Sequence, residues 1–272
     1  MNDPLKISSI IITKNEEANI ARCIESQLNC IDEIIVLVDI RTVDKTFEIA
    51  KSYPLVKAQA VNWMGYSGTK KYGVSLASND WIFWIDADEA LTNELSQELL
   101  LFKKTTPEFS AYSVPRKAYF LGRWIRHSGW YPGRVTRLFD KNKVSFSDND
   151  VHEHLVVNGT TGEPACRTDR LKNDIEHYTD PTIHHYFEKF NRYTTLAAEE
   201  MAKQGKVFKL SDIIFRPIFI FKKMYFFRLG FLDGVQGFIL AIFSAAYVFT
   251  KYCKFWELKR TGSKSNGKKV DK

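Results

Sequence analysis

The chain has 272 residues, 44% hydrophobic and 26% charged, so it is neither disordered nor fibrous and can build a large α/β core. Its net charge of +7 is unevenly placed, because residues 1–208 carry 26 basic and 28 acidic side chains whereas residues 209–272 carry 13 and 4. The four cysteines are irregularly spaced, which excludes a disulfide framework or a zinc ribbon, and the first residues lack a signal-peptide pattern. We expect a cytoplasmic protein with an acidic body and a basic, aromatic C-terminal end.

The N-terminal half alternates predicted strands and helices. Apolar runs predict strands at residues 7–13, 34–38 and 81–85, and residues 56–61 predict a weaker strand, the third in chain order. Capping residues and helical spacing predict one helix that begins near Asn15 and another that begins at Thr42 or Asp44. Two further helices are predicted over residues 69–77 and 93–102. This alternation predicts an α/β fold with a mainly parallel sheet and helices on both faces.

Polar side chains follow three of the predicted strands. They are the Thr13-Lys14-Asn15-Glu16 cluster, Asp39, and Asp86 with Asp88. Ligands of such sheets bind beyond the carboxyl ends of the strands, so we expect these groups to converge on one crevice. Neither a glycine-rich dinucleotide fingerprint nor a Walker-type loop is present, which favours binding through side chains and a metal ion.

Asp86 and Asp88 form the sharpest signal in the sequence. Two carboxylates that leave a buried strand at positions i and i+2 can point to the same side, where a cation relieves their repulsion. Mg²⁺ and Mn²⁺ prefer such oxygen ligands together with substrate phosphates. The alternative interpretation is a solvated acidic turn that caps the next helix.

The combination of motifs resembles family 2 glycosyltransferases of the GT-A fold, and within them a subgroup that adds sugars to the inner core of lipopolysaccharide, including β-1,4-glucosyltransferases. The resemblance spans roughly residues 7–258. Besides the polar clusters above, it rests on residues 119–127, 129–132, 137–139, 146–148, 151–153 and 191–198.

The resemblance implies a role for each matching position. By this resemblance the UDP-sugar is expected to be bound by Thr13, Asn15, Glu16, Asp39, Lys70 and Asp86, with Asp86 near the ribose. Asp88 and Asp86 are the expected ligands of the metal, Mg²⁺ or Mn²⁺, and His152 is a further candidate ligand. Two departures from the family pattern bear on substrate choice: Ile40-Arg41-Thr42-Val43 replaces a Ser/Gly-rich turn, and Gly133 stands where many relatives have an acidic residue.

An inverting transfer needs a carboxylate base for the acceptor hydroxyl. The polar segment 148–154 is the expected source, with Glu153 first, Asp150 second and Asp148 third. An exposed polar loop without a catalytic role is the alternative.

Arginines and aromatic residues between positions 116 and 137 suit an anionic saccharide. The expected acceptor-binding residues are Arg126, Trp130, Arg134 and Arg137, and a solvated basic face is the alternative. His177, His184 and His185 have no metal-ligand spacing and are interpreted as structural or surface residues.

The C-terminal end is aromatic and basic. Its longest uncharged stretch, 234–250, is shorter than the roughly 20 residues of a spanning helix, so amphipathic helices lying on the membrane surface are expected over residues 206–258. A basic disordered tail is expected at 259–272. The catalytic GT-A domain is expected at 1–205, with a donor half at about 1–105 and an acceptor half at about 106–205.

The expected function is a metal-dependent inverting transfer of a hexose, with glucose first, from a UDP-sugar to a membrane glycolipid such as lipopolysaccharide inner core. A non-catalytic nucleotide-sugar-binding or membrane-adaptor protein on the same scaffold is the main alternative, and another polysaccharide or lipid-linked acceptor is an alternative within the enzyme class. Nucleic-acid binding is disfavoured, because the positive charge lies beside phenylalanine-rich segments and no nucleic-acid module is present.

Overall fold

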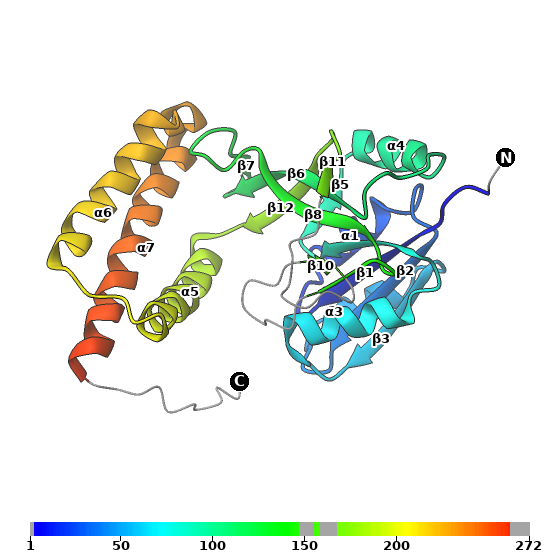
Figure 1. The fold of residues 1–272 in the computed structure, drawn as a ribbon, viewed down its shortest axis with the longest axis horizontal. Coiled ribbons are helices and arrows are strands. Elements are labelled where there is room, and N and C mark those ends of the chain that lie inside the picture. Colours follow the sequence, from blue (N-terminus) through cyan, green and yellow to red (C-terminus); the bar gives the residue numbers. More distant parts are fainter. Residues whose placement is uncertain (1–2, 147–154, 158–167, 262–272) are drawn as a thin grey trace. The chain divides into compact units, whose positions relative to one another are not determined.

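A computed structural model describes residues 3–146, 155–157 and 168–261 of the chain (Figure 1). The chain forms two compact units. The sheet unit comprises residues 1–117 and 133–177, and the helical unit comprises residues 118–132 and 178–272. The domain boundary expected after residue 205 lies inside the helical unit.

The four predicted strands are present as the parallel half of one large sheet. They are β1 (Ile7–Thr13), β2 (Glu33–Asp39), β3 (Val56–Val61) and β4 (Trp81–Asp86). The sheet order is β3-β2-β1-β4-β8-β6-β12-β5, and its second half is largely antiparallel. The further strands are β5 (Glu89–Leu91), β6 (Ala111–Phe120), β8 (Gly133–Asp140), β11 (Thr168–Arg170), β12 (Ile175–Asp180), and a separate pair, β9 (Val144–Phe146) with β10 (Leu155–Val157).

Three helices connect the parallel strands, and a fourth, α4, connects β5 to β6. They are α1 (Ile20–Glu25), α2 (Thr46–Lys51), α3 (Gly65–Leu76) and α4 (Asn93–Phe102). The prediction that Asn15 caps the first helix is wrong, because Asn19 occupies the cap position. Asn15 instead has a φ of 54°, and its side-chain oxygen accepts a hydrogen bond from the backbone of Val43 at 2.9 Å. The helix at α3 begins four residues before the predicted start at Thr69.

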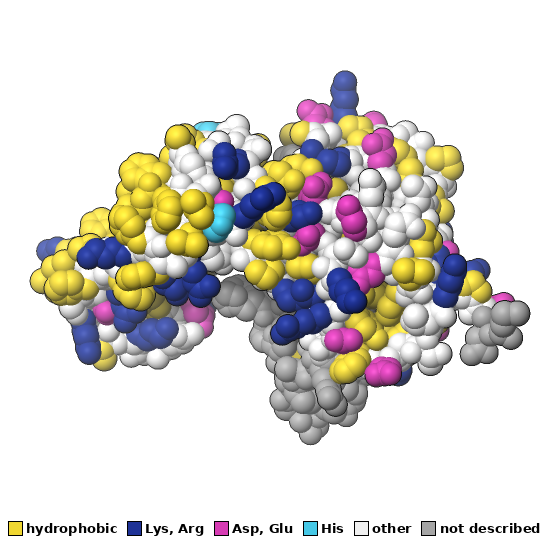
Figure 2. All heavy atoms as spheres, turned by 90° about the horizontal axis from the view of Figure 1, so that it is seen from above, with side chains coloured by type: hydrophobic (Ala, Val, Ile, Leu, Met, Phe, Trp, Pro, Cys, Tyr) yellow, Lys and Arg dark blue, Asp and Glu magenta, His cyan; other side chains and the backbone are white. Residues whose placement is uncertain are grey.

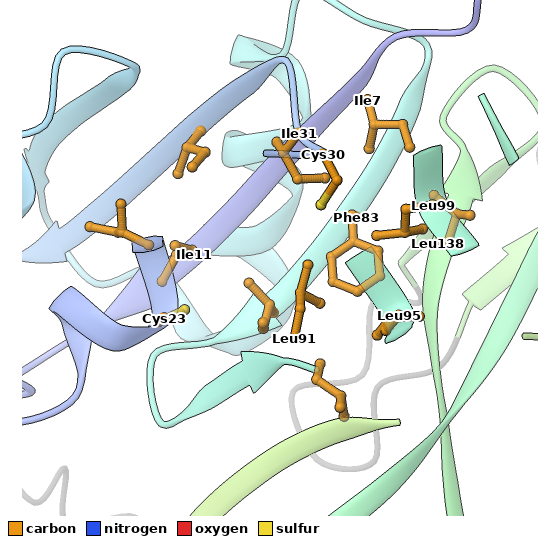
Figure 3. Packing of buried hydrophobic residues seen from close by; sticks show 14 of the residues in the cluster. Ile7, Ile11, Cys23, Cys30, Ile31, Phe83, Leu91, Leu95, Leu99 and Leu138 are labelled. Carbon is orange, nitrogen blue, oxygen red and sulfur yellow. The ribbon is translucent and has the colours of Figure 1, made fainter. Parts of the chain in front are cut away.

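The core of the sheet unit lies on both faces of the sheet, because successive strand side chains point to opposite sides. On one face Ile7, Ile11 and Phe83 pack against Cys23 of α1 and Leu95 and Leu99 of α4 (Figure 3). On the other face Ile10, Leu37 and Ile82 pack with residues of α3 and with β9 and β10. Burial of each large apolar side chain contributes about 1.5–3 kcal/mol, which fixes the register of the strands. The predicted mainly parallel sheet with helices on both faces is confirmed.

The helical unit consists of β7 (Arg123–Trp124), α5 (Ile183–Lys203), α6 (Leu210–Lys222), the π-helical turn η1 (Lys223–Phe227), the 3₁₀ turn η2 (Gly230–Asp233) and α7 (Gly234–Thr261). The helix α7 packs against both α5 and α6. Two small apolar clusters hold the unit together, one around Phe255 and Ala198 and one around Phe120, Ile125 and Leu240.

Much of the apolar surface of the helical unit is exposed. Phe215, Phe219 and Phe227 are 66%, 59% and 75% exposed. Figure 2 shows hydrophobic side chains interspersed with lysine and arginine at the left of the view, where the helical unit lies. Within the described ranges, the helix Gly230–Arg260 is long and apolar enough to cross a membrane by length and composition alone, a test that core helices of soluble proteins also pass.

Candidate active site

The carboxyl ends of β1, β2 and β4 bring three of the predicted polar clusters together. Strand β1 lies between β2 and β4, with Ile12 opposite Asp86 and Thr13 opposite Val38. The side chains that follow these positions therefore share one edge of the sheet. The predicted convergence of the nucleotide-site residues follows from this register.

Arg137 of β8 is the charged group that organises this edge. Its guanidinium is 1% exposed and its Nη2 lies 2.6 Å from Oδ2 of Asp86 and 2.5 Å from Oε2 of Glu89. Strand β8 pairs antiparallel with β4, and this pairing brings the arginine beside the end of β4. Arg137 therefore does not present its charge to solvent, which differs from the sequence expectation that it binds the acceptor.

The same ion pairs separate the pKa values of the two carboxyls. Burial alone raises the pKa of Asp86, but the charges of Arg137 and Lys70 outweigh it and lower this pKa to about 2. For Glu89, which is fully enclosed, burial dominates and raises the pKa, and the nearby charge of Asp86 adds to this effect. Of these two carboxyls, Asp86 is therefore the one that stays ionised, and its side chain is 37% exposed.

Trp84 lies between two cations at this edge. The Nζ of Lys70 and the guanidinium carbon of Arg137 each lie 3.6 Å from its ring centroid. The indole Nε1 donates a hydrogen bond to the carbonyl of Thr136 at 2.8 Å, which fixes the ring. Lys70 comes from α3 and is 3% exposed, and its charge acts on the carboxyl of Asp86.

Asp88 has a partner that the sequence did not reveal. The Nε2 of His177 lies 3.3 Å from Oδ2 of Asp88, and the two side chains are 14% and 19% exposed. The antiparallel pairing of β12 with β5 places His177 opposite Glu89, one residue from Asp88. The spacing of residues in the sequence cannot predict this strand pairing. Without it, His177 is interpreted as a structural or surface residue.

The carboxylate of Asp88 is a donor that Mg²⁺ and Mn²⁺ prefer, and both ions keep further sites for phosphate and water oxygens. An imidazole suits Mn²⁺ less well than a carboxylate does, and suits Mg²⁺ least. No cluster of three or more His, Cys, Asp or Glu side chains suited to a metal occurs among the described residues. The Nδ1 atom of His177 is buried and has no hydrogen-bond partner within those residues. The residues present therefore fit a metal that takes its remaining ligands from the substrate.

The remaining nucleotide candidates line the ends of β1 and β2. Asp39 is 2% exposed, and Arg41 holds it through contacts of 2.6–3.2 Å that lower the pKa of this carboxyl. The hydroxyl of Thr13 is buried and has no hydrogen-bond partner among the described residues, which suits a ligand. Glu16 accepts a hydrogen bond from Asn19, and its backbone NH donates to Thr46.

The predicted acceptor residues divide between the two units. In the sheet unit Arg134 donates to the carbonyls of Ser113 and Leu171 at 2.7 and 2.6 Å, which ties neighbouring strands together. Arg126 and Trp130 belong to the helical unit, where the Arg126 guanidinium stacks over Trp124 at 4.3 Å. The base candidates Glu153, Asp150 and Asp148 and the metal candidate His152 lie outside the described residues.

Comparison with known proteins identifies the family of the chain. The model of the family "Glycosyl transferase family 2" matches residues 8–156. An uncharacterised glycosyltransferase of Rickettsia typhi is 34% identical over 93% of this chain and 87% of its own. The lipopolysaccharide core biosynthesis glycosyltransferase LpsC of Rhizobium meliloti is 31% identical over 93% of both chains.

The fold has a counterpart among solved structures. A mannosyltransferase of Pyrobaculum calidifontis, solved with GDP-Man and Mn²⁺, superposes with a TM-score of 0.54 over 94% of this chain and 88% of its own, at 11% identity. That likeness concerns the fold alone. The family model, the near full-length relatives and the fold together establish that this chain belongs to glycosyl transferase family 2 and is a glycosyltransferase of the GT-A fold.

Proposed function

We propose that this glycosyltransferase moves a hexose, with glucose the first candidate, from a UDP-sugar to a saccharide of a membrane glycolipid such as lipopolysaccharide inner core. The part of this proposal that concerns the UDP-sugar rests on one observation. Asp39, Asp86 and Asp88 lie at one edge of the sheet, with Lys70 and His177 beside them. The relative named for lipopolysaccharide core biosynthesis supports the part of the proposal that concerns the acceptor.

Each residue of the sheet edge has a task in this proposal. Thr13 and Asp39 bind the uridine, and ionised Asp86 accepts hydrogen bonds from the ribose hydroxyls. Asp88 and His177 hold Mg²⁺ or Mn²⁺, which supplies positive charge to the leaving diphosphate. Lys70 adds a second positive charge on the same side.

The proposed reaction inverts the anomeric carbon. A carboxylate removes the proton of the acceptor hydroxyl as that oxygen attacks, and UDP leaves with the bonding electrons. Glu153 is the first candidate for this base, ahead of Asp150 and Asp148. Glu153→Gln is expected to abolish transfer while UDP-sugar binding stays normal, and near-normal turnover would reject the assignment.

A donor screen with the purified enzyme tests the function as a whole. The enzyme, Mn²⁺ and one donor at a time (UDP-glucose, UDP-galactose, UDP-N-acetylglucosamine, GDP-mannose) are incubated with lipopolysaccharide from a strain that lacks this protein. Mass spectrometry should show one added hexose from UDP-glucose, lost in Asp88→Asn and kept in Asp80→Asn, an exposed aspartate of the same unit. An unmodified core with every donor would contradict the proposed acceptor.

We also propose that the helical unit attaches the enzyme to the inner face of the cytoplasmic membrane without spanning it. Exposed aromatic side chains of α6 and η1 lie among Arg216, Lys222 and Lys223, a composition suited to an anionic lipid surface. Tyr252 and Phe255 of α7 are buried by contacts within the unit, which favours a helix packed on protein at that end.

Vesicle sedimentation tests this attachment. Phe215→Ser combined with Phe219→Ser should reduce binding to phosphatidylglycerol vesicles at least severalfold, because two exposed rings are removed. Leu101→Ser is the matched control, since Leu101 is 64% exposed on α4 of the sheet unit. Equal binding by both variants would contradict attachment through α6.

A further inference from the structure

The helical unit contains a buried carboxylate that lies outside the nucleotide-site residues. Asp233 is 2% exposed and stands at the end of η2, directly before α7. Its carboxylate accepts hydrogen bonds from the backbone NH groups of Arg126 at 3.1 Å and His127 at 3.0 Å. Its Oδ1 also lies 3.0 Å from the Nδ1 of His127. One carboxylate thus holds both the backbone and the imidazole of a loop 106 residues earlier in the chain.

This contact fixes the orientation of the His127 ring. A carboxylate can only accept, so Nδ1 carries the proton and Nε2 is the atom left to contact a ligand. The side chain of His127 is 32% exposed, and no hydrogen bond to its Nε2 occurs within the part of the chain that the structure describes. The arrangement is a preoriented imidazole at the surface of the helical unit.

The loop and the turn interlock too closely to move independently. Ser128 has a φ of 59° and its NH donates to the carbonyl of Arg228 at 2.8 Å. A Cβ at Gly230 would lie 2.5 Å from the Ser128 hydroxyl, and one at Gly237 would lie 2.0 Å from the Gly230 carbonyl. Glycine at both positions permits this close approach.

Three arginines lie close in the fold to the loop and turn that Asp233 joins. Arg126 adjoins His127 in the chain, the Arg228 side chain packs near Gly129, and Arg123 packs near Gly234. None of these three arginines forms an ion pair with a carboxylate of the described residues. Both oxygens of Asp233 already contact the loop, and the three arginines add positive charge that attracts anions.

We propose that His127, held by Asp233 and flanked by Arg123, Arg126 and Arg228, binds a phosphate or carboxylate group of the saccharide acceptor. This inference rests on the proposed function and deepens it, because it names the chemical class of the acceptor and the residues that recognise it. Guanidinium and imidazole groups bind such anions through charge-assisted hydrogen bonds. Asp233 acts as a positioning residue, since it contacts His127 and not the anion.

Direct binding is tested on the unmodified full chain. Inorganic phosphate is titrated into protein labelled with ¹⁵N in its 6 histidines, and the ring signals are followed by NMR. The His127 signals should shift saturably, while those of His184, an exposed histidine of α5, should not. Asp233→Asn should abolish the saturable shift. Equal shifts at His127 and His184, or no shift at His127, would overturn the proposal.

Kinetics separate positioning from a purely structural role. His127→Ala and Asp233→Asn should each raise the acceptor KM about tenfold, the usual effect of a lost charged hydrogen bond, with the Kd for UDP unchanged. The double variant should be no worse than either single one, because both remove the same contact. His184→Ala and Asp212→Asn are matched controls in the same unit. Additive losses that follow a lowered Tm would assign Asp233 a structural role and overturn its positioning role.

Two further outcomes are distinguishable. If no UDP-sugar serves as donor but His127 still binds phosphate saturably, the proposed function fails while the anion site stands. If His127→Ala lowers binding to phosphatidylglycerol vesicles and leaves the acceptor KM unchanged, the cluster binds a lipid headgroup, and the acceptor proposal is wrong.

Discussion

The Nη2 atom of Arg137 lies within 2.6 Å of both Asp86 and Glu89, so one buried guanidinium holds the two carboxylates at the end of β4. Glu89, which is fully buried, cannot turn away without losing the charge that offsets its burial. Arg137 is consequently central to the shape of the donor site, although its Nε and Nη1 atoms have no hydrogen-bond partner among the described residues.

Replacement of this arginine should therefore affect folding and donor binding together. Arg137→Met removes the nearest positive charge from buried Glu89, which among the described residues keeps only the backbone NH of Asp86 at 3.1 Å and Arg116 at 3.7 Å, at a cost of about 3–5 kcal/mol in the free energy of unfolding. The Kd for UDP should rise at least tenfold, because Asp86 loses the contact that orients it. Urea unfolding and isothermal titration calorimetry measure the two effects.

A double variant distinguishes the two effects. Arg137→Met with Glu89→Leu replaces the buried pair by apolar groups and should recover much of the stability. UDP binding should stay weak, since Asp86 still lacks its partner. Full recovery of UDP binding would mean that Arg137 is not required to orient Asp86.

His177 should be a metal ligand together with Asp88. His177→Ala is expected to weaken Mn²⁺ binding in the presence of UDP about tenfold, and Asp88→Asn by more, because the carboxylate supplies the charge. Electron paramagnetic resonance of Mn²⁺ measures both. His184→Ala is the control, and an affinity in His177→Ala equal to that of the unmodified enzyme would remove His177 from the site.

Arg41 should compete with the nucleotide for Asp39. Its guanidinium binds both oxygens of that carboxylate, at 3.0 Å from Oδ1 and 2.6 Å from Oδ2, and so occupies acceptor positions that the uracil of a bound nucleotide would share. Arg41→Ala is expected to tighten UDP binding severalfold, and Asp39→Asn to weaken it. Weaker binding by Arg41→Ala in calorimetry would show that Arg41 itself contacts the nucleotide.

Glu33 should make stability depend on acidic pH. Burial tends to raise its pKa, but hydrogen bonds from Lys57, Ser8 and Ser78 outweigh this and lower the pKa to about 2. A carboxyl with a lowered pKa stabilises the fold fully above its ordinary pKa, and that contribution is lost as the pH falls toward 2.

Glu33→Gln should accordingly lower the free energy of unfolding by roughly 2–3 kcal/mol at pH 7 and much less at pH 2. Urea denaturation across this pH range gives both values. Glu48→Gln, an exposed glutamate of α2, should change stability by less than about 0.5 kcal/mol. A loss in Glu33→Gln that is equal at both pH values would contradict the role of its charge.

The parallel half of the fold was accessible from the sequence because β1, β2 and β4 are nearly continuous apolar runs, whereas β3, which includes Lys57 and Gln59, gave a weaker signal. Strand β1 has the predicted ends Ile7 and Thr13, and α4 spans the predicted residues 93–102. The polar residues at the strand ends then follow from the topology of parallel sheets.

The antiparallel half was less accessible, because pairing between distant strands leaves no local pattern. Arg137 looked like part of a basic surface, and only the pairing of β8 with β4 places it under Asp86. His177 lacked metal-ligand spacing because its partner Asp88 is 89 positions earlier (177 minus 88) and reaches it through β5 and β12. Asp233 likewise gave no signal in the sequence beyond interrupting an apolar run.

The contact between Asp233 and the loop at Arg126 spans 107 positions of the chain, which has a consequence for synthesis. A ribosome that adds about 5–20 residues per second exposes the loop several seconds before the carboxylate that orders it. The sheet unit includes no residue beyond 177, so the sheet edge with Asp39, Asp86 and Asp88, which we propose binds the donor, can form first. A nascent chain would therefore gain the capacity to hold a donor before the capacity to order the His127 loop, and the last helix synthesised would complete the enzyme.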